Sequence, residues 1–142
     1  MRRLICVMTV TVIAGITLSA CGSDPYCDKV EQNESTLNSF GNTKSNKAYA
    51  TYAKTLKSIA KEAPKDVKSD WQDLAEATSD VLDAQRDAGI KLEDTKDEKK
   101  LAKLSPDKLA ELNKAYRAFN DTGEQRAAVV KNVKQECEIT LE

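Results

Sequence analysis

Apolar residues recur at steps of three and four between residues 25 and 137, and no segment alternates apolar and polar residues over a useful length. A period near 3.6 is typical of amphipathic helices, whereas a strand has a period of two. Aromatic residues make up only 5% of the chain, and glycine and proline are scarce, which also favours helices. The sequence therefore predicts an all-α fold, a small antiparallel bundle of four to five helices.

Three helices are predicted before residue 90, over residues 25–37, 45–62 and 64–88. Pro64 ends the second helix, because proline disfavours helical geometry in the preceding residue, and it is a favoured first residue of the third. Gly89 is a typical stop. We expect the second and third helices to form an antiparallel hairpin. The residues expected to face inward are Tyr49, Tyr52, Leu56, Ile59, Ala63, Val67, Trp71, Leu74, Thr78 and Val81.

A charge-dense connector, residues 90–104, follows Gly89, and its mixed signs indicate a solvated loop or a fraying helical turn. Ser105-Pro106-Asp107 then predicts a fourth helix, because serine caps helices, proline suits the first position and aspartate favours the positive end of the helix dipole. The residues of this helix expected to face inward are Leu109, Leu112, Tyr116 and Phe119.

Asp121 and Glu124 have the spacing of a capping box around Gly123, which predicts the start of a fifth helix. This helix is expected to run to Cys137 through Ala127, Val130 and Val133. A single kinked helix from residue 106 to 137 is the alternative, since one glycine costs a helix only about 1 kcal/mol.

Residues 1–20 have the pattern of a signal peptide, in which Arg2 and Arg3 precede an apolar run over residues 4–18. The run is shorter than the roughly 20 residues that span a bilayer, and no positively charged flank follows it. We therefore interpret residues 1–20 as a cleaved signal instead of a membrane helix.

Leu18-Ser19-Ala20-Cys21 resembles the lipobox of bacterial lipoproteins, in which the cysteine thiol receives a diacylglycerol before cleavage. Ordinary secretory cleavage fits less well, because Leu18 stands where that site has a small residue. The resemblance implies lipid attachment at Cys21 and an extracytoplasmic protein anchored to the cell membrane. Residues 21–26 are then expected to be the attachment site and a short tether, and residues 27–142 one helical domain.

Cys27 and Cys137 remain as a pair, because Cys6 leaves with the signal peptide and Cys21 carries lipid. In an oxidising compartment we expect them to form a disulfide that closes the bundle. A closed loop of about 110 residues stabilises a fold by roughly 4–5 kcal/mol on the chain-entropy model. A metal pair or a redox dithiol is disfavoured, since the chain has no histidine and no C-x-x-C motif.

Ala63-Pro64-Lys65-Asp66-Val67 between two helices, the early cysteine and a last helix ending Val133-Lys134-Gln135-Glu136-Cys137 resemble features of a broad group of actinobacterial proteins. These are small helical proteins that are secreted or lipid-anchored. The resemblance covers most of the chain after the signal peptide and implies the fold, the disulfide and an actinobacterial host. It implies no activity.

Charge is segregated between the second and third helices. No acidic residue occurs between Glu34 and Glu62, and the second helix has a basic outer face formed by Lys47, Lys54, Lys57 and Lys61. The third helix has an acidic outer face formed by Asp66, Asp70, Asp73, Glu76, Asp80, Asp83 and Asp87. A helical wheel at about 100° per residue places each set opposite the apolar residues of its helix.

These faces have two interpretations. They are solvated surfaces that attract each other weakly, at about 0.2–1 kcal/mol per exposed pair. Alternatively, the basic face lies on anionic lipid, which attracts each lysine by about 1 kcal/mol, and the acidic face meets a protein partner. A Ca²⁺ or Mg²⁺ site is disfavoured, because carboxylates along one rigid helix point apart, so no metal is expected.

Several functions are excluded or disfavoured by what the sequence lacks. Without histidine, Ser-His-Asp and Cys-His catalysis are excluded, and no glycine-rich phosphate loop is present. The net charge is −1, and removal of the signal peptide makes it −3, which gives no argument for nucleic-acid binding. No cofactor is expected.

We therefore expect a non-enzymatic envelope lipoprotein that binds a protein or a cell-surface component. The alternative is a carrier that holds a small apolar ligand inside the bundle. Trp71, Tyr49, Tyr52 and Tyr116 are the candidate pocket residues, although such residues more often form the bulky part of a helical core.

Overall fold

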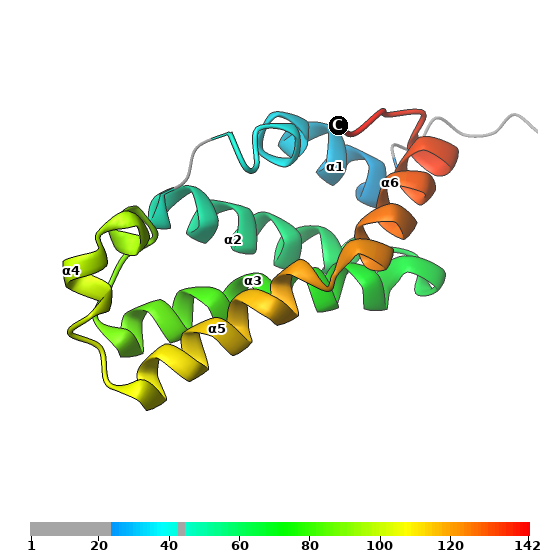
Figure 1. Cartoon of the computed structure of the whole chain (residues 1–142). Coiled ribbons are helices and arrows are strands. Elements are labelled where there is room, and N and C mark those ends of the chain that lie inside the picture. Colours follow the sequence, from blue (N-terminus) through cyan, green and yellow to red (C-terminus); the bar gives the residue numbers. More distant parts are fainter. Residues whose placement is uncertain (1–23, 43–44) are drawn as a thin grey trace, which may run out of the picture.

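The computed structural model describes residues 24–42 and 45–142, in which every regular element is helical (Figure 1). Within these residues, five helices have at least 14 residues each. They are α1 (Pro25–Asn38), α2 (Asn46–Glu62), α3 (Lys65–Ala88), α5 (Pro106–Asn120) and α6 (Gly123–Cys137). Two short elements, the 3-10 helix η1 (Leu92–Lys96) and α4 (Glu98–Leu101), lie between α3 and α5. The predicted all-α fold is confirmed, while the predicted signal peptide and Cys21 lie outside the described residues.

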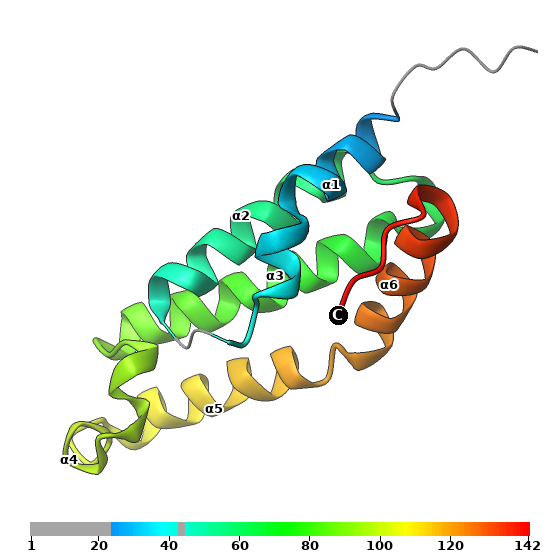
Figure 2. The ribbon, with the colours of Figure 1, turned by 90° about the horizontal axis from the view of Figure 1, so that it is seen from above.

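The central helix of the bundle is α3. It lies between α2 and α5 (Figure 2), and α1 lies above α2 (Figure 1). α2 and α3 form the predicted antiparallel hairpin, which has the most extensive contact of any two helices that the structure describes. α6 turns away from the line of α5 and packs against α3 and α1.

Helix ends follow the local chemistry of the sequence. The Oγ atoms of Ser45 and Ser105 accept hydrogen bonds from the backbone N–H three residues on, at 3.2 and 3.4 Å. Pro64 directly precedes α3 with an extended ψ of 156°. Gly89 ends α3 with a φ of +72°, the left-handed conformation that glycine adopts without a steric penalty.

The largest apolar core lies where α1, α2, α3 and α6 meet. Its most deeply buried members are Tyr26, Val30, Leu56, Ile59, Trp71 and Val133. The inward face predicted for α3 is confirmed, since all five of its predicted residues are buried. On α2 the prediction also holds, except that Tyr49 is only half-buried.

A chain of buried hydrogen bonds crosses this core. The Nε1–H of Trp71 donates to Oη of Tyr26 at 3.1 Å, and Tyr26 donates to Oδ1 of Asn132 at 2.9 Å. The amide of Asn132 donates in turn to Oδ2 of Asp66 at 3.4 Å. Because buried polar groups destabilise a fold unless they are hydrogen-bonded, these bonds favour one arrangement of α1, α3 and α6.

The predicted disulfide joins Cys27 in the first turn of α1 to Cys137 at the end of α6, with Cα atoms 5.2 Å apart. The corner between α2 and α3 lies at the same end of the bundle (Figure 1), which we call the disulfide end. Pro25 and Tyr26, expected to be part of a tether, belong to α1, and Tyr26 is fully buried. The bundle therefore begins two residues earlier than expected.

The opposite end of the bundle, which we call the distal end, has a smaller core. It consists of Ala88, Ile90 and Leu112. Here the charged connector, predicted to be either a loop or a helical turn, forms the helical elements η1 and α4. The backbone N–H of Leu92 donates to Oδ1 of Asn46 at 2.5 Å, which holds η1 against the start of α2.

The inward residues predicted for the last two helices are partly wrong. Leu109 is 38% exposed, because α5 packs mainly on α3 and buries only a narrow stripe. In α6 Val133 is buried, but Ala127 and Val130 are exposed and Val129 is buried instead. Sequence periodicity locates an apolar stripe without showing how many neighbouring helices cover it.

The junction between α5 and α6 also differs from the expectation. They are two helices, as predicted, and the alternative of one kinked helix is wrong. However, the capping box of Asp121 and Glu124 does not form, since Thr122 is the N-cap of α6 and makes no capping hydrogen bond. Its hydroxyl donates to the carbonyl of Phe119 at 2.7 Å, which closes the end of α5.

Candidate functional site

All four lysines of the predicted basic face are exposed on α2. Six of the seven carboxylates of the predicted acidic face are exposed on α3, and Asp70 is half-buried. Asp66 differs from the others in role, because it accepts the hydrogen bond from Asn132 that ends the buried chain. The remaining acidic residues are free of such structural bonds within the described part of the chain.

The two charged faces do not neutralise each other. Within residues 24–42 and 45–142, no nitrogen–oxygen distance of 4.0 Å or less joins a lysine of the basic face to a carboxylate of the acidic face. Asp83 and Asp87 instead pair with Arg86 of their own helix, at 2.8 and 3.5 Å. These side chains are exposed, so the pairs contribute little to stability.

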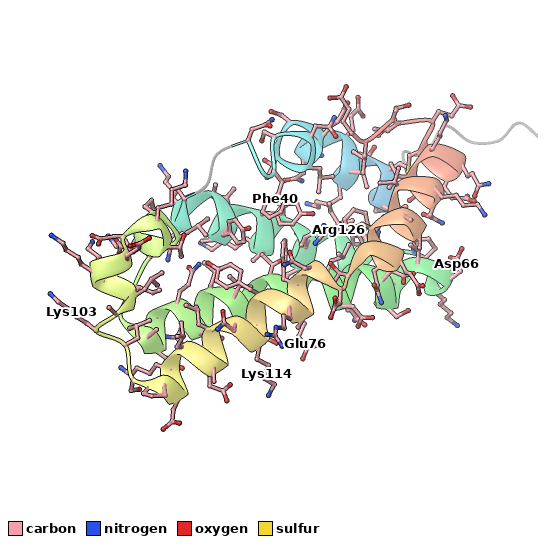
Figure 3. The ribbon with its side chains drawn as sticks, viewed as in Figure 1. Phe40, Asp66, Glu76, Lys103, Lys114 and Arg126 are labelled. Carbon is pink, nitrogen blue, oxygen red and sulfur yellow. A yellow bond between two sulfur atoms is a disulfide. The ribbon has the colours of Figure 1, made fainter. Side chains whose placement is uncertain are left out.

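The basic and acidic faces meet along a groove of about 780 Å³ between α2 and α3. Lys57 and Lys61 line it from α2, and Glu76 and Asp80 line it from α3. Figure 3 shows the position of Glu76 on α3. The two faces are therefore neighbours across one groove and do not lie on opposite sides of the domain.

A second groove, of about 410 Å³, lies on the other side of the acidic row, between α3 and α5. Its carboxylates come from both helices: Asp80, Asp83 and Asp87 of α3, and Asp107 and Glu111 of α5. Alanines of the two helices form its floor. Two basic residues, Lys108 and Lys114, also line it. Figure 3 shows Lys114 projecting from α5. We call this feature the acidic groove.

The contribution of α5 to the acidic groove was not predicted from the sequence. Asp107 and Glu111 are four residues apart and therefore share one face of a helix. That spacing was a usable signal, but only the packing of α5 against α3 shows that it adds to the acidic row.

A cavity of about 220 Å³ lies beneath Phe40, between α1, α2, α3 and α6. The ring of Phe40 stacks on Tyr52 with centroids 3.6 Å apart, and Tyr52 and Trp71 both line the cavity. Arg126 of α6 lines it too, and Figure 3 shows this side chain extending from α6 toward Phe40. Of the pocket candidates named from sequence, Tyr52 and Trp71 are therefore core residues that also face a cavity.

The guanidinium group of Arg126 is held by the end of α5. Its Nη2 donates to the carbonyl of Phe119 at 2.7 Å, and its Cζ lies 4.7 Å from the centroid of the Phe119 ring. Burial raises the pKa of Tyr52 and of Tyr49, and the positive charge of Arg126 opposes that rise in both. The guanidinium thus acts electrostatically on the aromatic residues around the cavity.

The other resolved pKa shifts are structural. Burial is the main cause of the raised pKa of Tyr26 and of Tyr116. In the connector, the hydrogen bond from Lys100 lowers the pKa of Asp94, and the same bond raises the pKa of Lys100. This pair joins η1 to α4 at the surface and faces none of the grooves described above.

No group of three or more cysteine or acidic side chains in residues 24–42 and 45–142 is placed to hold a metal ion. None of the helices in these ranges combines the length and the apolar character that crossing a membrane requires.

Comparison with known proteins assigns the chain to no family. No family model, no curated protein and no solved structure matches it. Function is therefore inferred from the chain's own residues and geometry.

Proposed function

We propose that this chain is a lipoprotein of the cell envelope, anchored through lipid on Cys21 to the outer face of the cell membrane of an actinobacterium. Its bundle is a non-enzymatic interaction module that binds a protein or a cell-surface component. The Cys27–Cys137 disulfide supports export, because disulfides persist in oxidising compartments and are rare in the cytosol.

The start of α1 keeps such a module close to the membrane. Asp24 caps α1, so only Gly22 and Ser23 separate it from Cys21 in the sequence. At about 3.6 Å per residue, the chain between them spans roughly 1 nm at most. The disulfide end then faces the lipid, and the bundle works within one domain length of the surface.

The acidic groove is the observation that carries the interaction role. Carboxylates from α3 and α5 converge on it, and its alanine floor lets another backbone approach closely. Charge complementarity therefore favours a partner with a basic segment, attracted over a distance near the Debye length of about 8 Å at physiological salt. The exposed lysines of α2, on the far side of the acidic row, are free to meet anionic lipid.

The anchor is tested by growing the host with an alkyne analogue of palmitate. We expect the chain to be labelled, and a Cys21→Ser variant to lose the label and its membrane attachment. A wild-type protein found unlabelled and free in the culture fluid would overturn the anchor.

The interaction surface is tested by photo-crosslinking in intact cells, with the crosslinker at Ala118 in the acidic groove and, as a control, at Lys54 on α2. We expect a discrete adduct from position 118 that is lost in the charge-reversal pair Asp80→Lys, Glu111→Lys. Adducts that are identical at the two positions, or insensitive to charge reversal, would contradict the acidic groove as the partner surface.

The carrier alternative has one specific observation in its favour, the cavity beneath Phe40. It needs neither the acidic groove nor the lipid anchor, and it can be tested separately.

A further inference from the structure

The cavity beneath Phe40 combines apolar walls with one cation. Its walls include the rings of Phe40, Tyr52 and Trp71 and the aliphatic side chains of Leu74 and Val129. Among residues 24–42 and 45–142, Arg126 is the only basic residue that lines it, and Glu142 is the only acidic one. A largely apolar pocket with a single polar anchoring group is the usual form of a small-molecule site.

The guanidinium of Arg126 keeps hydrogen-bond donors that the fold does not engage. Of the five N–H donors of its guanidinium, the structure engages Nη2, which donates to the carbonyl of Phe119. Within the described residues, no carboxylate oxygen lies within 4.0 Å of its nitrogens. Arg86 and Arg117 are exposed, whereas Arg126 is half-buried, so its charge is partly removed from water without a counter-ion.

The Phe119 carbonyl and ring compensate the Arg126 charge in part, and an entering anion would supply the counter-charge that they do not. Arginine suits a carboxylate in particular, because its planar fork makes two parallel hydrogen bonds with the two oxygens. Glu142 at the edge of the cavity is exposed and negative, which disfavours a ligand with two or more negative charges. One guanidinium opposed by this charge therefore favours a ligand with a single negative charge over one with several.

The volume limits the apolar part of the ligand. Drug-sized sites occupy about 300–1,000 Å³, and this cavity has about 220 Å³. A single aromatic ring or a short acyl chain suits that space. The stacked rings of Phe40 and Tyr52 and the buried Trp71 offer flat apolar surfaces to either.

We propose that the cavity beneath Phe40 binds a small organic carboxylate, with its carboxylate group on Arg126 and its apolar part against Tyr52 and Trp71. The site depends neither on the lipid anchor nor on the acidic groove. Its presence or absence leaves the proposed interaction role unchanged.

Trp71 provides a direct readout, because it is the only tryptophan of the chain and lines the cavity. The full chain in vesicles of neutral phosphatidylcholine is titrated with 3-phenylpropionate, and the neutral alcohol 3-phenylpropanol is the matched probe. Empty vesicles provide the blank for partition into lipid. Equilibrium dialysis measures the binding of both probes independently of Trp71 fluorescence. We expect the carboxylate to change Trp71 emission and to bind at least tenfold more tightly than the alcohol.

Single variants test separately how the charge of Arg126 and the space of the cavity contribute to binding. Arg126→Gln is expected to abolish the preference for the carboxylate, while Arg117→Gln, which removes an exposed arginine, leaves it unchanged. Glu142→Gln is expected to strengthen carboxylate binding a few-fold, because it removes the negative charge of the side chain at the edge. Val130→Phe, at an exposed position that lines the cavity, is expected to weaken both probes by filling it.

Circular dichroism establishes that each variant is folded, and if Arg126→Gln is not, Glu142→Gln and Val130→Phe carry the test. The proposal is overturned if neither probe binds at millimolar concentration, if the two probes bind equally, or if a folded Arg126→Gln protein retains the preference. It is also overturned if binding is unaffected by filling the cavity.

Discussion

The disulfide end and the distal end of the bundle differ in the size of their apolar cores and in the bonds that stabilise them. At the disulfide end four helices share one continuous apolar core, a chain of buried hydrogen bonds crosses it, and a covalent bond closes it. At the distal end the core consists of three buried residues, and the adjoining helical segments are short and charged.

The polar groups of the two ends show the same contrast. Tyr26 at the disulfide end uses its hydroxyl both as donor and as acceptor. Gln85, toward the distal end, is fully buried, and its Oε1 has no hydrogen-bond partner in the described structure. The difference indicates that stability is concentrated beside the proposed anchor, whereas the end farther from it opens at lower free energy, as is usual for regions with few buried contacts.

The largest expected effect is the loss of the disulfide. Replacing both Cys27 and Cys137 with alanine is expected to lower the free energy of unfolding by about 4–5 kcal/mol, because the closed loop no longer restricts the unfolded chain. Urea denaturation measures the change, and the reduced wild-type protein should match the variant. A loss below about 1 kcal/mol would show that the core holds this end without the covalent bond.

The second-largest effect is expected from removing a tyrosine hydroxyl, which should cost more stability at the disulfide end than toward the distal end. Tyr26→Phe is expected to destabilise the protein by about 1–3 kcal/mol, because it leaves the Trp71 N–H and the Asn132 amide oxygen without their partner in the core. Tyr116→Phe is the matched change, at a half-buried position where Gln85 donates to the hydroxyl at 2.6 Å. It should have a smaller effect, because this hydroxyl makes one hydrogen bond where that of Tyr26 makes two. Equal losses in urea denaturation would contradict the contrast.

A more local effect is expected from Asn46→Ala, which removes the acceptor for the Leu92 N–H. The expected loss of global stability is about 1 kcal/mol or less. Amide hydrogen exchange should accelerate in η1 while the protection of α1 and α6 stays unchanged. Asn113→Ala, at an exposed position on α5, is the control and should alter neither region.

The smallest change in stability is expected from Gln85→Met. Methionine has a similar length. It removes the buried oxygen that lacks a partner and also the hydrogen bond to the half-buried Tyr116 hydroxyl. These two changes oppose each other, so the free energy of unfolding should stay within about 1 kcal/mol of the wild-type value. Asn132→Leu at the disulfide end is the contrasting variant and should be clearly destabilising, because Tyr26 and Asp66 lose their partner. A large loss from Gln85→Met, measured by thermal unfolding, would show that Gln85 has a structural role.

Local chemistry made much of the fold predictable. Ser45, Pro64, Gly89 and Ser105 mark helix ends through interactions within a few residues, and each does so in the structure. The pairing of Cys27 with Cys137 followed from counting cysteines, although the alignment of α1 with α6 that permits it is a property of the whole fold.

Features that depend on distant neighbours were not predictable in the same way. Phe40 lies in a polar loop, and nothing in its local sequence shows that it stacks on Tyr52 and contributes to a cavity. The sequence around Arg126 does not distinguish it from an exposed arginine, because its contact with Phe119 depends on how α6 packs against the end of α5. Leu109 has the right spacing for burial, but among the described helices α5 packs mainly on α3, which leaves Leu109 exposed.

The position of the disulfide also has a mechanical consequence. A pull on the chain ahead of α1 enters the bundle at Pro25 and reaches Cys27 within the first helical turn. The covalent bond passes the load to the last turn of α6, so α1 cannot be peeled from its neighbours turn by turn. Drag on the domain would therefore swing it about this point as a rigid body and leave its helices intact.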